Sequence, residues 1–273
     1  MKKILFPTDF SERANKALDQ ALMIAEAFNS KMIIHHTYSR SVDSGNTSGH
    51  PGRRINSLES EQNFDLAFKK LLDKSEKLRN VSHVFNSAQG TVVENIINTS
   101  TKEQVDLIIM ATKGARGFGE LFGTKTAKIV KSADVPILVI PDNATLENIN
   151  KLGLICDYSR EINYGSLEFL LKLASQLKLY VDVITINRSE KVMTDSEKTY
   201  RQQVLKKLES VPSTVNFSFN SNVDEGIIDY SKKNDIGMIA MMPKSYSFME
   251  RLFHESLTEK MTFSSPIPLL VLK

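Results

Sequence analysis

The segment 111–124 has the residue types of a phosphate-binding loop. Glycines let backbone N–H groups approach a phosphate closely, and a helix beginning at the end of the loop adds the positive end of its dipole. The four glycines of the segment fall within ten residues, at Gly114, Gly117, Gly119 and Gly123. Positive charges and hydroxyl donors come from Lys113, Arg116, Thr124, Lys125 and Thr126. The segment favours a phosphate-bearing ligand, with a ligand-free surface loop as the alternative.

Two other polar segments follow apolar runs. Pro7, Thr8 and Asp9 end the first run, and His36 ends the second. In a doubly wound sheet, ligands bind beyond the carboxyl ends of the strands, so all three segments are expected at one crevice. Asp9 is also open to interpretation as a helix cap, and His36 as a packing or surface residue rather than one that stacks on a base. His35 and His36 are not a metal pair, because neighbouring strand residues point to opposite faces.

Five apolar runs separated by helical patterns predict the elements that hold these segments. Apolar strands without alternation, between amphipathic helices, indicate a parallel sheet covered on both faces. Right-handed crossovers make such a sheet doubly wound. The strands are predicted at 3–7, 32–35, 83–88, 105–111 and 136–140, and the helices after Ser11, over 64–78, near 92–101 and over 124–132. The Ser- and Gly-rich segment 39–57 is predicted to be a loop.

The same order of runs returns after residue 150, which indicates an internal repeat of about 130 residues. Asp157-Tyr158-Ser159 matches Asp9-Phe10-Ser11, and the other matches pair 181–186 with 32–35, 235–240 with 106–111, and 267–272 with 135–140. We therefore predict two five-stranded domains, 1–142 and 150–273, that pack together. The second domain has Pro243 where Gly114 stands and no glycine in that segment, so we expect it to lack the loop chemistry.

Length and composition narrow the class of protein. The 273 residues suit two α/β domains, at about 100–200 residues each. A net charge of +3 with no basic run argues against a nucleic-acid binder. Cys156 is the only cysteine, so no internal disulfide or cysteine metal site is expected. No run approaches about 18 apolar residues and the first is too short for a signal peptide, so we expect a cytoplasmic protein without a membrane span.

The chain resembles the universal stress protein family in its tandem two-domain form. The resemblance rests on the opening strand and turn, 3–12, and on the ending formed by 106–110, the glycine-rich loop and 136–140. It implies an adenine-nucleotide α-hydrolase-like fold that binds ATP. We expect any Mg²⁺ to be held by the phosphates, because hard ions favour oxygen ligands and retained water. By the same resemblance Asp9 contacts the nucleoside, and Gly114, Gly123 and Thr124 belong to the phosphate motif.

The glycine motif departs from that family's pattern at two points. Ala111 stands in place of its first glycine, where a methyl group would crowd the ribose. Eight residues rather than nine separate Gly114 from Gly123. Gly117 and Gly119 give the loop spare freedom to absorb this deletion.

These features predict a nucleotide-responsive stress or signalling protein without a dedicated reaction. The sequence shows no nucleophile–base pair and no P-loop, so we predict no catalytic residue and no protein-held metal, and slow ATP hydrolysis would be incidental. A nucleotide-free interaction protein is the alternative. An adenylating enzyme would carry Ser-Gly-Gly-x-Asp-Ser after the first strand, which is absent. The resemblance implies pairing of the last strands, 136–140 with 268–272, and leaves a homodimer and a protein partner open.

Overall fold

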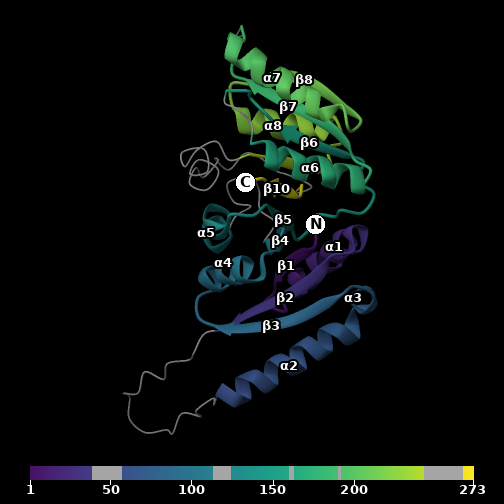
Figure 1. Cartoon of the computed structure of the whole chain (residues 1–273), viewed down its shortest axis with the longest axis vertical. Helices are drawn as coiled ribbons and strands as arrows, with labels where there is room; N and C mark the ends of the chain where they lie inside the picture. Colours follow the sequence, from purple (N-terminus) through teal and green to yellow (C-terminus); the bar gives the residue numbers. More distant parts are fainter. Residues whose placement is uncertain (39–56, 113–123, 160–162, 190–191, 243–266) are drawn as a thin grey trace, which may run out of the picture.

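The computed structural model joins two parallel five-stranded sheets into one sheet of ten strands (Figure 1). It describes residues 1–38, 57–112, 124–159, 163–189, 192–242 and 267–273, and within the helices the side chains of 57–63 and of Thr124 are not described. The strand order is β3-β2-β1-β4-β5-β10-β9-β6-β7-β8. The strands are β1 (Lys3–Pro7), β2 (Lys31–Tyr38), β3 (His83–Gln89), β4 (Leu107–Thr112), β5 (Ile137–Pro141), β6 (Lys151–Ile155), β7 (Tyr180–Asn187), β8 (Ser213–Phe219), β9 (Met238–Met241) and β10 (Leu269–Val271).

Helices cover both faces of the sheet, as the continuous apolar strands predict. In Figure 1, α1 and α6 lie on one side of the sheet and α4 and α5 on the other. The helices are α1 (Glu12–Phe28), α2 (Ser57–Lys74), α3 (Glu76–Asn80), α4 (Val92–Glu103), α5 (Thr124–Ser132), α6 (Tyr164–Gln176), α7 (Asp195–Leu208) and α8 (Val223–Lys233). None of the helices in the described ranges is long and apolar enough to cross a membrane.

The helix predicted over 64–78 is two helices, α2 and α3. Ser75 separates them, because its hydroxyl accepts a hydrogen bond from the backbone N–H of Leu78 and caps α3. Serine favours this capping role over a helix interior. The predicted loop at 39–57 lies outside the described residues, except that residue 57 opens α2.

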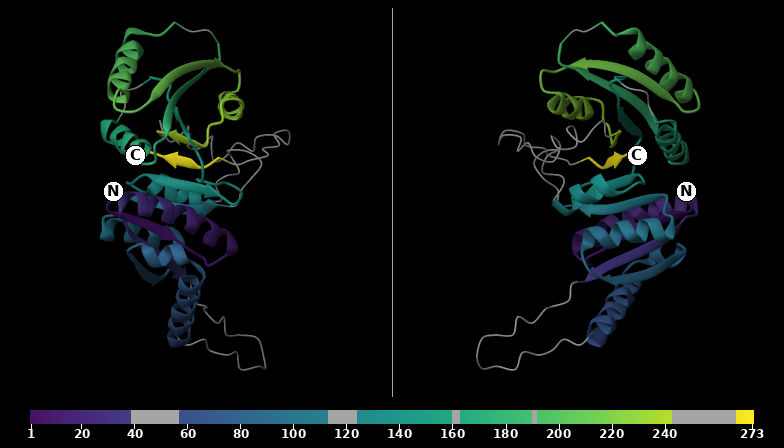
Figure 2. Two further views of the ribbon diagram at one scale, coloured as in Figure 1. Left: turned by 90° about the vertical axis from the view of Figure 1, so that its right-hand side faces the viewer. Right: turned by 60° about the vertical axis from the view of Figure 1, so that its left-hand side comes forward.

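The two halves meet at an antiparallel pair, β5 with β10, which confirms the predicted pairing of the last strands. Leu138 lies opposite Leu270 in this seam, and both side chains are fully buried. Two apolar layers, one on each face of the sheet, continue across the seam from the first half into the second. Figure 2 shows β5 and β10 between the halves, so the halves share their cores and pack together as predicted.

The segment 142–150, which joins the halves, is bound to α1. The Gln20 side-chain oxygen accepts the backbone N–H of Leu146 at 2.7 Å, and the Leu146 side chain is buried. The ammonium group of Lys77, in α3, lies 3.8 Å from the Glu147 carboxylate. The connection is therefore part of the folded first half rather than a free linker.

The structure corrects the predicted match between 235–240 and 106–111 by two residues. Ile4 of β1 pairs with Leu107, whereas the equivalent Leu152 of β6 pairs with Met238. Met238 is therefore the counterpart of Leu107, and counting four residues onward makes Met242 the counterpart of Ala111. The same shift places the counterpart of Gly114 beyond Pro243, outside the described residues.

Candidate functional site

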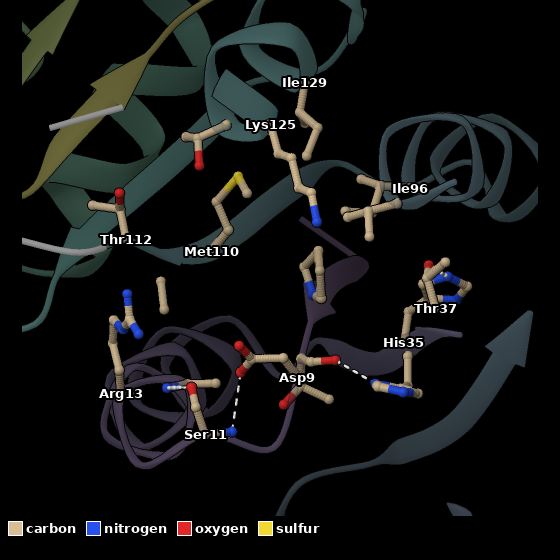
Figure 3. Close-up of a pocket in the computed structure, with 17 residues that line it drawn as sticks. Asp9, Ser11, Arg13, His35, Thr37, Ile96, Met110, Thr112, Lys125 and Ile129 are labelled. Carbon is tan, nitrogen blue, oxygen red and sulfur yellow. Dashed lines mark hydrogen bonds between the residues drawn. The ribbon is translucent and has the colours of Figure 1, made fainter. Parts of the chain in front are cut away.

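A pocket of about 330 Å³ lies at the carboxyl ends of β1, β2 and β4 (Figure 3). The ends of α1, α4 and α5 close its sides, so it occupies the crevice predicted for a doubly wound sheet. Six of the predicted site residues line it: Pro7, Thr8, Asp9, His36, Ala111 and Lys125. Thr124 begins α5, but its side chain is not described. The predicted Lys113, Gly114 and Gly123 lie outside the described residues.

The turn after β1 places Asp9 at the mouth of this pocket. Thr8 extends the pairing with β2 by donating its N–H to the carbonyl of His35 at 2.8 Å, and its hydroxyl accepts the N–H of Phe10 at 3.0 Å. Phe10 takes the left-handed conformation, with φ of 60°. The Ser11 hydroxyl then accepts the N–H of Ala14 and caps α1. The capping interpretation of Asp9 is therefore wrong, because Ser11 holds that position.

Asp9 provides a carboxylate that stays ionised. One of its oxygens accepts the N–H of Ser11 at 3.0 Å. Partial burial raises the pKa of this carboxyl, but the hydrogen bonds from Ser11 and the positive charge of Arg13 outweigh burial and leave the pKa below its usual value. Figure 3 shows the carboxylate pointing into the space between β1 and β4, where it can accept hydrogen bonds from a ligand.

His36 packs among aromatic rings. Its ring centroid lies 4.8 Å from that of Phe10 and 4.8 Å from that of Phe64. Its Nδ1 lies 2.8 Å from the carbonyl oxygen of Thr8, and because a carbonyl only accepts, Nδ1 carries the proton. The structure favours the packing role over base stacking, and this ring ties β2 to the end of β1.

His35 forms part of the pocket wall as a neutral imidazole. Its side chain is 1% exposed, and its Nε2 lies 3.1 Å from the hydroxyl oxygen of Thr37. Burial, together with the neighbouring His36, lowers the pKa of His35 to about 4. The imidazole therefore contributes polarity but no charge to the pocket near neutral pH.

The remaining lining combines two cations with an apolar wall. Arg13 of α1 and Lys125 of α5 bring positive charge, and Thr126 adds a buried hydroxyl. The apolar wall comes from Val92, Ile96, Met110 and Ile129. Arg13 was not predicted, because it stands in an ordinary helical pattern; its place four residues after Asp9 was the available signal.

The same turn is present in the second half. Tyr158 matches Phe10, with φ of 55°, and Asp157 accepts the N–H of Ser159 at 3.1 Å as Asp9 accepts that of Ser11. The Thr185 hydroxyl donates to the carbonyl of Cys156 at 2.7 Å, in place of the bond from His36 to Thr8. The turn that holds the acidic side chain therefore exists twice in the chain.

The match to a family of known proteins covers the first half of the chain. The model of the universal stress protein family matches residues 1–141. A universal stress protein of Thermus aquaticus is 28% identical over 148 residues, covering 51% of this chain and 98% of that protein. One from Methanocaldococcus jannaschii is 28% identical over 140 residues, covering 51% of this chain and 81% of its own.

A solved structure extends the likeness in fold to both halves. The crystal structure of a universal stress protein from Archaeoglobus fulgidus aligns with a TM-score of 0.70 and 17% identity, covering 99% of this chain and 96% of that one. The family match over the first half agrees with the fold and with the turn built around Asp9. The chain belongs to the universal stress protein family.

Proposed function

We propose that the chain is a nucleotide-responsive signalling protein that binds an adenine nucleotide, ATP in the simplest case, in the pocket of its first half. The observation that carries this proposal is the convergence of Asp9, Arg13 and Lys125 on one pocket at the carboxyl ends of β1 and β4. A crevice at this place in a doubly wound sheet is where such folds bind nucleotides. Its volume of about 330 Å³ lies within the range of small-molecule sites.

The lining fits the two parts of a nucleotide. The apolar wall of Val92, Ile96 and Met110 offers a flat purine a surface to bury, and Asp9 offers an acceptor to sugar hydroxyls. Lys125 and Thr126, in the first turn of α5, suit phosphate oxygens because the helix dipole adds to their charge and hydrogen bonding. Ala111 lines the pocket at the end of β4, where it pairs with Ile140 of β5.

A bound Mg²⁺ would be held by the phosphates. The described residues contain no cluster of three or more His, Cys, Asp or Glu side chains that could hold a metal ion. Mg²⁺ keeps several waters and accepts phosphate oxygens as ligands, so it needs no protein cage. The ion would neutralise part of the phosphate charge.

Binding rather than turnover is the proposed role. The Thr8 hydroxyl accepts the N–H of Phe10, the Ser11 hydroxyl accepts that of Ala14, and the His36 Nδ1 proton is directed to a backbone carbonyl. These three groups are therefore engaged with the backbone. The Thr37 hydroxyl lies 3.1 Å from His35 Nε2, but a pKa of about 4 makes this imidazole a weak base. We propose that bound nucleotide acts by changing the chain's association with itself or with a protein partner.

Titration calorimetry of ATP, ADP and AMP onto the purified chain tests the proposal. We expect saturable binding of at least one of them, and no heat from any at millimolar concentration would overturn it in favour of a nucleotide-free interaction protein. Gly114→Val, in the predicted phosphate loop, should abolish binding. Ser256→Val, at the matching end of the second half's segment, is the control and should bind as the wild type does. Equal binding by both variants would show that the site lies elsewhere.

A further inference from the structure

Arg13 occupies a position that the helix itself disfavours. It is the second residue of α1, after the capping Ser11, where the positive end of the helix dipole repels a cation. Its neighbour Glu12 is paired with Lys16 at 3.5 Å. Across the described residues, no carboxylate lies within ion-pair distance of the Arg13 guanidinium, and the nearby Asp9 already accepts the N–H of Ser11. Within the described residues, the helix start therefore opposes this charge, and the attraction of Asp9, whose pKa Arg13 lowers, offsets it without a direct ion pair.

The side chain is directed at the pocket rather than at solvent. Arg13 is half-buried and lines the pocket, and Figure 3 shows its guanidinium group extending from α1 toward Thr112 at the end of β4. His35 and Thr37 lie at the opposite side of the same view, beside Ile96. Lys125 enters from α5 between these two sides. The pocket therefore has a cationic side and a side made of imidazole, hydroxyl and aliphatic groups.

The described lining carries an excess of positive charge. Asp9 is its one carboxylate, against the two cations Arg13 and Lys125, and His35 is neutral near pH 7. An anionic ligand would balance this charge, whereas a neutral nucleoside would not. A residue that breaks a local rule, as Arg13 does at the start of α1, is expected at a functional site.

We propose that Arg13 is a specificity-determining residue that binds a phosphate oxygen of the nucleotide, so that the site selects phosphorylated adenosine over adenosine itself. This inference rests on the proposed function and assigns the phosphate contact to α1, outside the glycine-rich loop. A guanidinium presents a planar fork that matches two phosphate oxygens, which an ammonium group cannot do. The bound phosphate would give the Arg13 guanidinium a directly hydrogen-bonded anionic partner, which no described carboxylate provides.

Calorimetric titration of ATP and of adenosine onto the wild type, Arg13→Gln, Arg13→Lys and Lys16→Gln tests this assignment. Lys16→Gln removes the same charge one turn further along α1, outside the pocket lining. We expect Arg13→Gln to weaken ATP about tenfold or more, since a charge-assisted hydrogen bond to phosphate is lost, and to leave adenosine within about twofold. Arg13→Lys should recover only part of the ATP affinity. Lys16→Gln should bind both ligands as the wild type does.

The experiment distinguishes failure of the proposed function from failure of the Arg13 assignment. A wild type that binds neither ligand overturns the proposed function and this inference together. Equal weakening of ATP and adenosine by Arg13→Gln overturns the inference alone, because Arg13 would then shape the pocket. An equal loss of ATP affinity in Lys16→Gln also overturns the inference. The loss would then come from a long-range electrostatic effect rather than from a direct contact between Arg13 and phosphate. Thermal unfolding of the ligand-free variants supplies a second readout: Arg13→Gln should not unfold at a lower temperature than the wild type, and a clear drop would indicate a structural role.

Discussion

The two halves of the chain build the same turn after their first strand but differ in what surrounds it. Phe10 and Tyr158 share the left-handed conformation, and each turn places an aspartate whose oxygen accepts an N–H two residues on. Beyond the turn, Ile184 stands where His35 stands, and Met242 stands where Ala111 stands. The second half therefore replaces a polar group and a small side chain of the pocket with larger apolar ones.

The helix that flanks the strand ends also differs. Asn95 of α4 and Gly226 of α8 are equivalent, since the N–H of each bonds the carbonyl of its helix-capping residue. A Cβ added at Gly226 would come within 2.7 Å of the Ile186 side chain and 2.8 Å of that of Asn220. In the second half, α8 thus lies directly against the end of β7. The two halves therefore share the turn but differ in the size and polarity of the side chains behind it.

The largest effect is expected when residue 111 of the first half receives the second half's side chain. Ala111→Met should lower the affinity for ATP by about a hundredfold, because the longer side chain enters the pocket lining. Calorimetry would measure this, with circular dichroism to verify folding. Met242→Ala is the matched control and should leave ATP binding unchanged. Unchanged binding by Ala111→Met would mean that the residue behind the turn does not decide access.

His35 should make the stability of the first half depend on pH in a way that Ile184 cannot. The folded-state pKa of about 4 lies below the ordinary value of 6.5, so the unfolded chain binds the proton more tightly. Stability from this group is present above pH 6.5 and is lost as pH falls toward 4, by up to about 3 kcal/mol. Denaturant unfolding between pH 4 and 7 should show a smaller loss for His35→Ile than for the wild type.

The control for that measurement is His83→Gln, which removes a partly exposed imidazole from β3. It should follow the wild-type profile over the whole range. If His35→Ile loses as much stability on acidification as the wild type, the buried imidazole is not the group responsible.

The close packing of α8 against β7 can be tested at Gly226. Gly226→Ala should lower the free energy of unfolding by about 1–2 kcal/mol, because overpacking outweighs the gain in helix propensity. Gly165→Ala, in α6, is the control: its added Cβ would meet only one side-chain oxygen, at 3.3 Å, and should change stability little. A stabilised Gly226→Ala would show that α8 has room to move away from β7.

The smallest effect is expected at the hydrogen bond that ties the second half's turn to β7. Thr185→Val keeps the shape of the side chain but removes the hydroxyl that donates to Cys156, at a loss of about 1 kcal/mol. Ser210→Ala removes a hydroxyl bonded to the carbonyl of Lys207 at the exposed end of α7, and should cost less. Chemical denaturation would measure the free energy of unfolding of both variants. Equal losses would show that the buried hydrogen bond stabilises the protein no more than the exposed one.

Much of this fold follows from the sequence because the strands are long apolar runs. The pairing of 136–140 with 268–272 is confirmed in β5 and β10. The position of β9 was missed by two residues, since a slip of two keeps every side chain on the same face and leaves the apolar pattern unchanged. Asp235, matched to Asp106, is instead the left-handed residue after α8, as Gln104 is after α4.

The candidate site was predictable only where residues follow a strand in sequence. Asp9, Thr8 and Ala111 end strands, and the structure places all three at the pocket. Arg13 reaches it because the first turn of α1 lies over the end of β1, and His36 turns to Phe64 because α2 folds back over β2. Such contacts depend on the position and orientation of each helix on the sheet, which the spacing of residues in the sequence does not determine.

The seam between β5 and β10 makes the association of the two halves unimolecular. Two separate chains joined through such strands would come apart on dilution, whereas segments of one chain face each other at an effective concentration on the order of millimolar. Dilution should therefore leave the seam intact, and its stability should not depend on protein concentration. A second half held in this way does not need a ligand site of its own. It can still act as a covalently linked partner domain that covers the last strand of the first half.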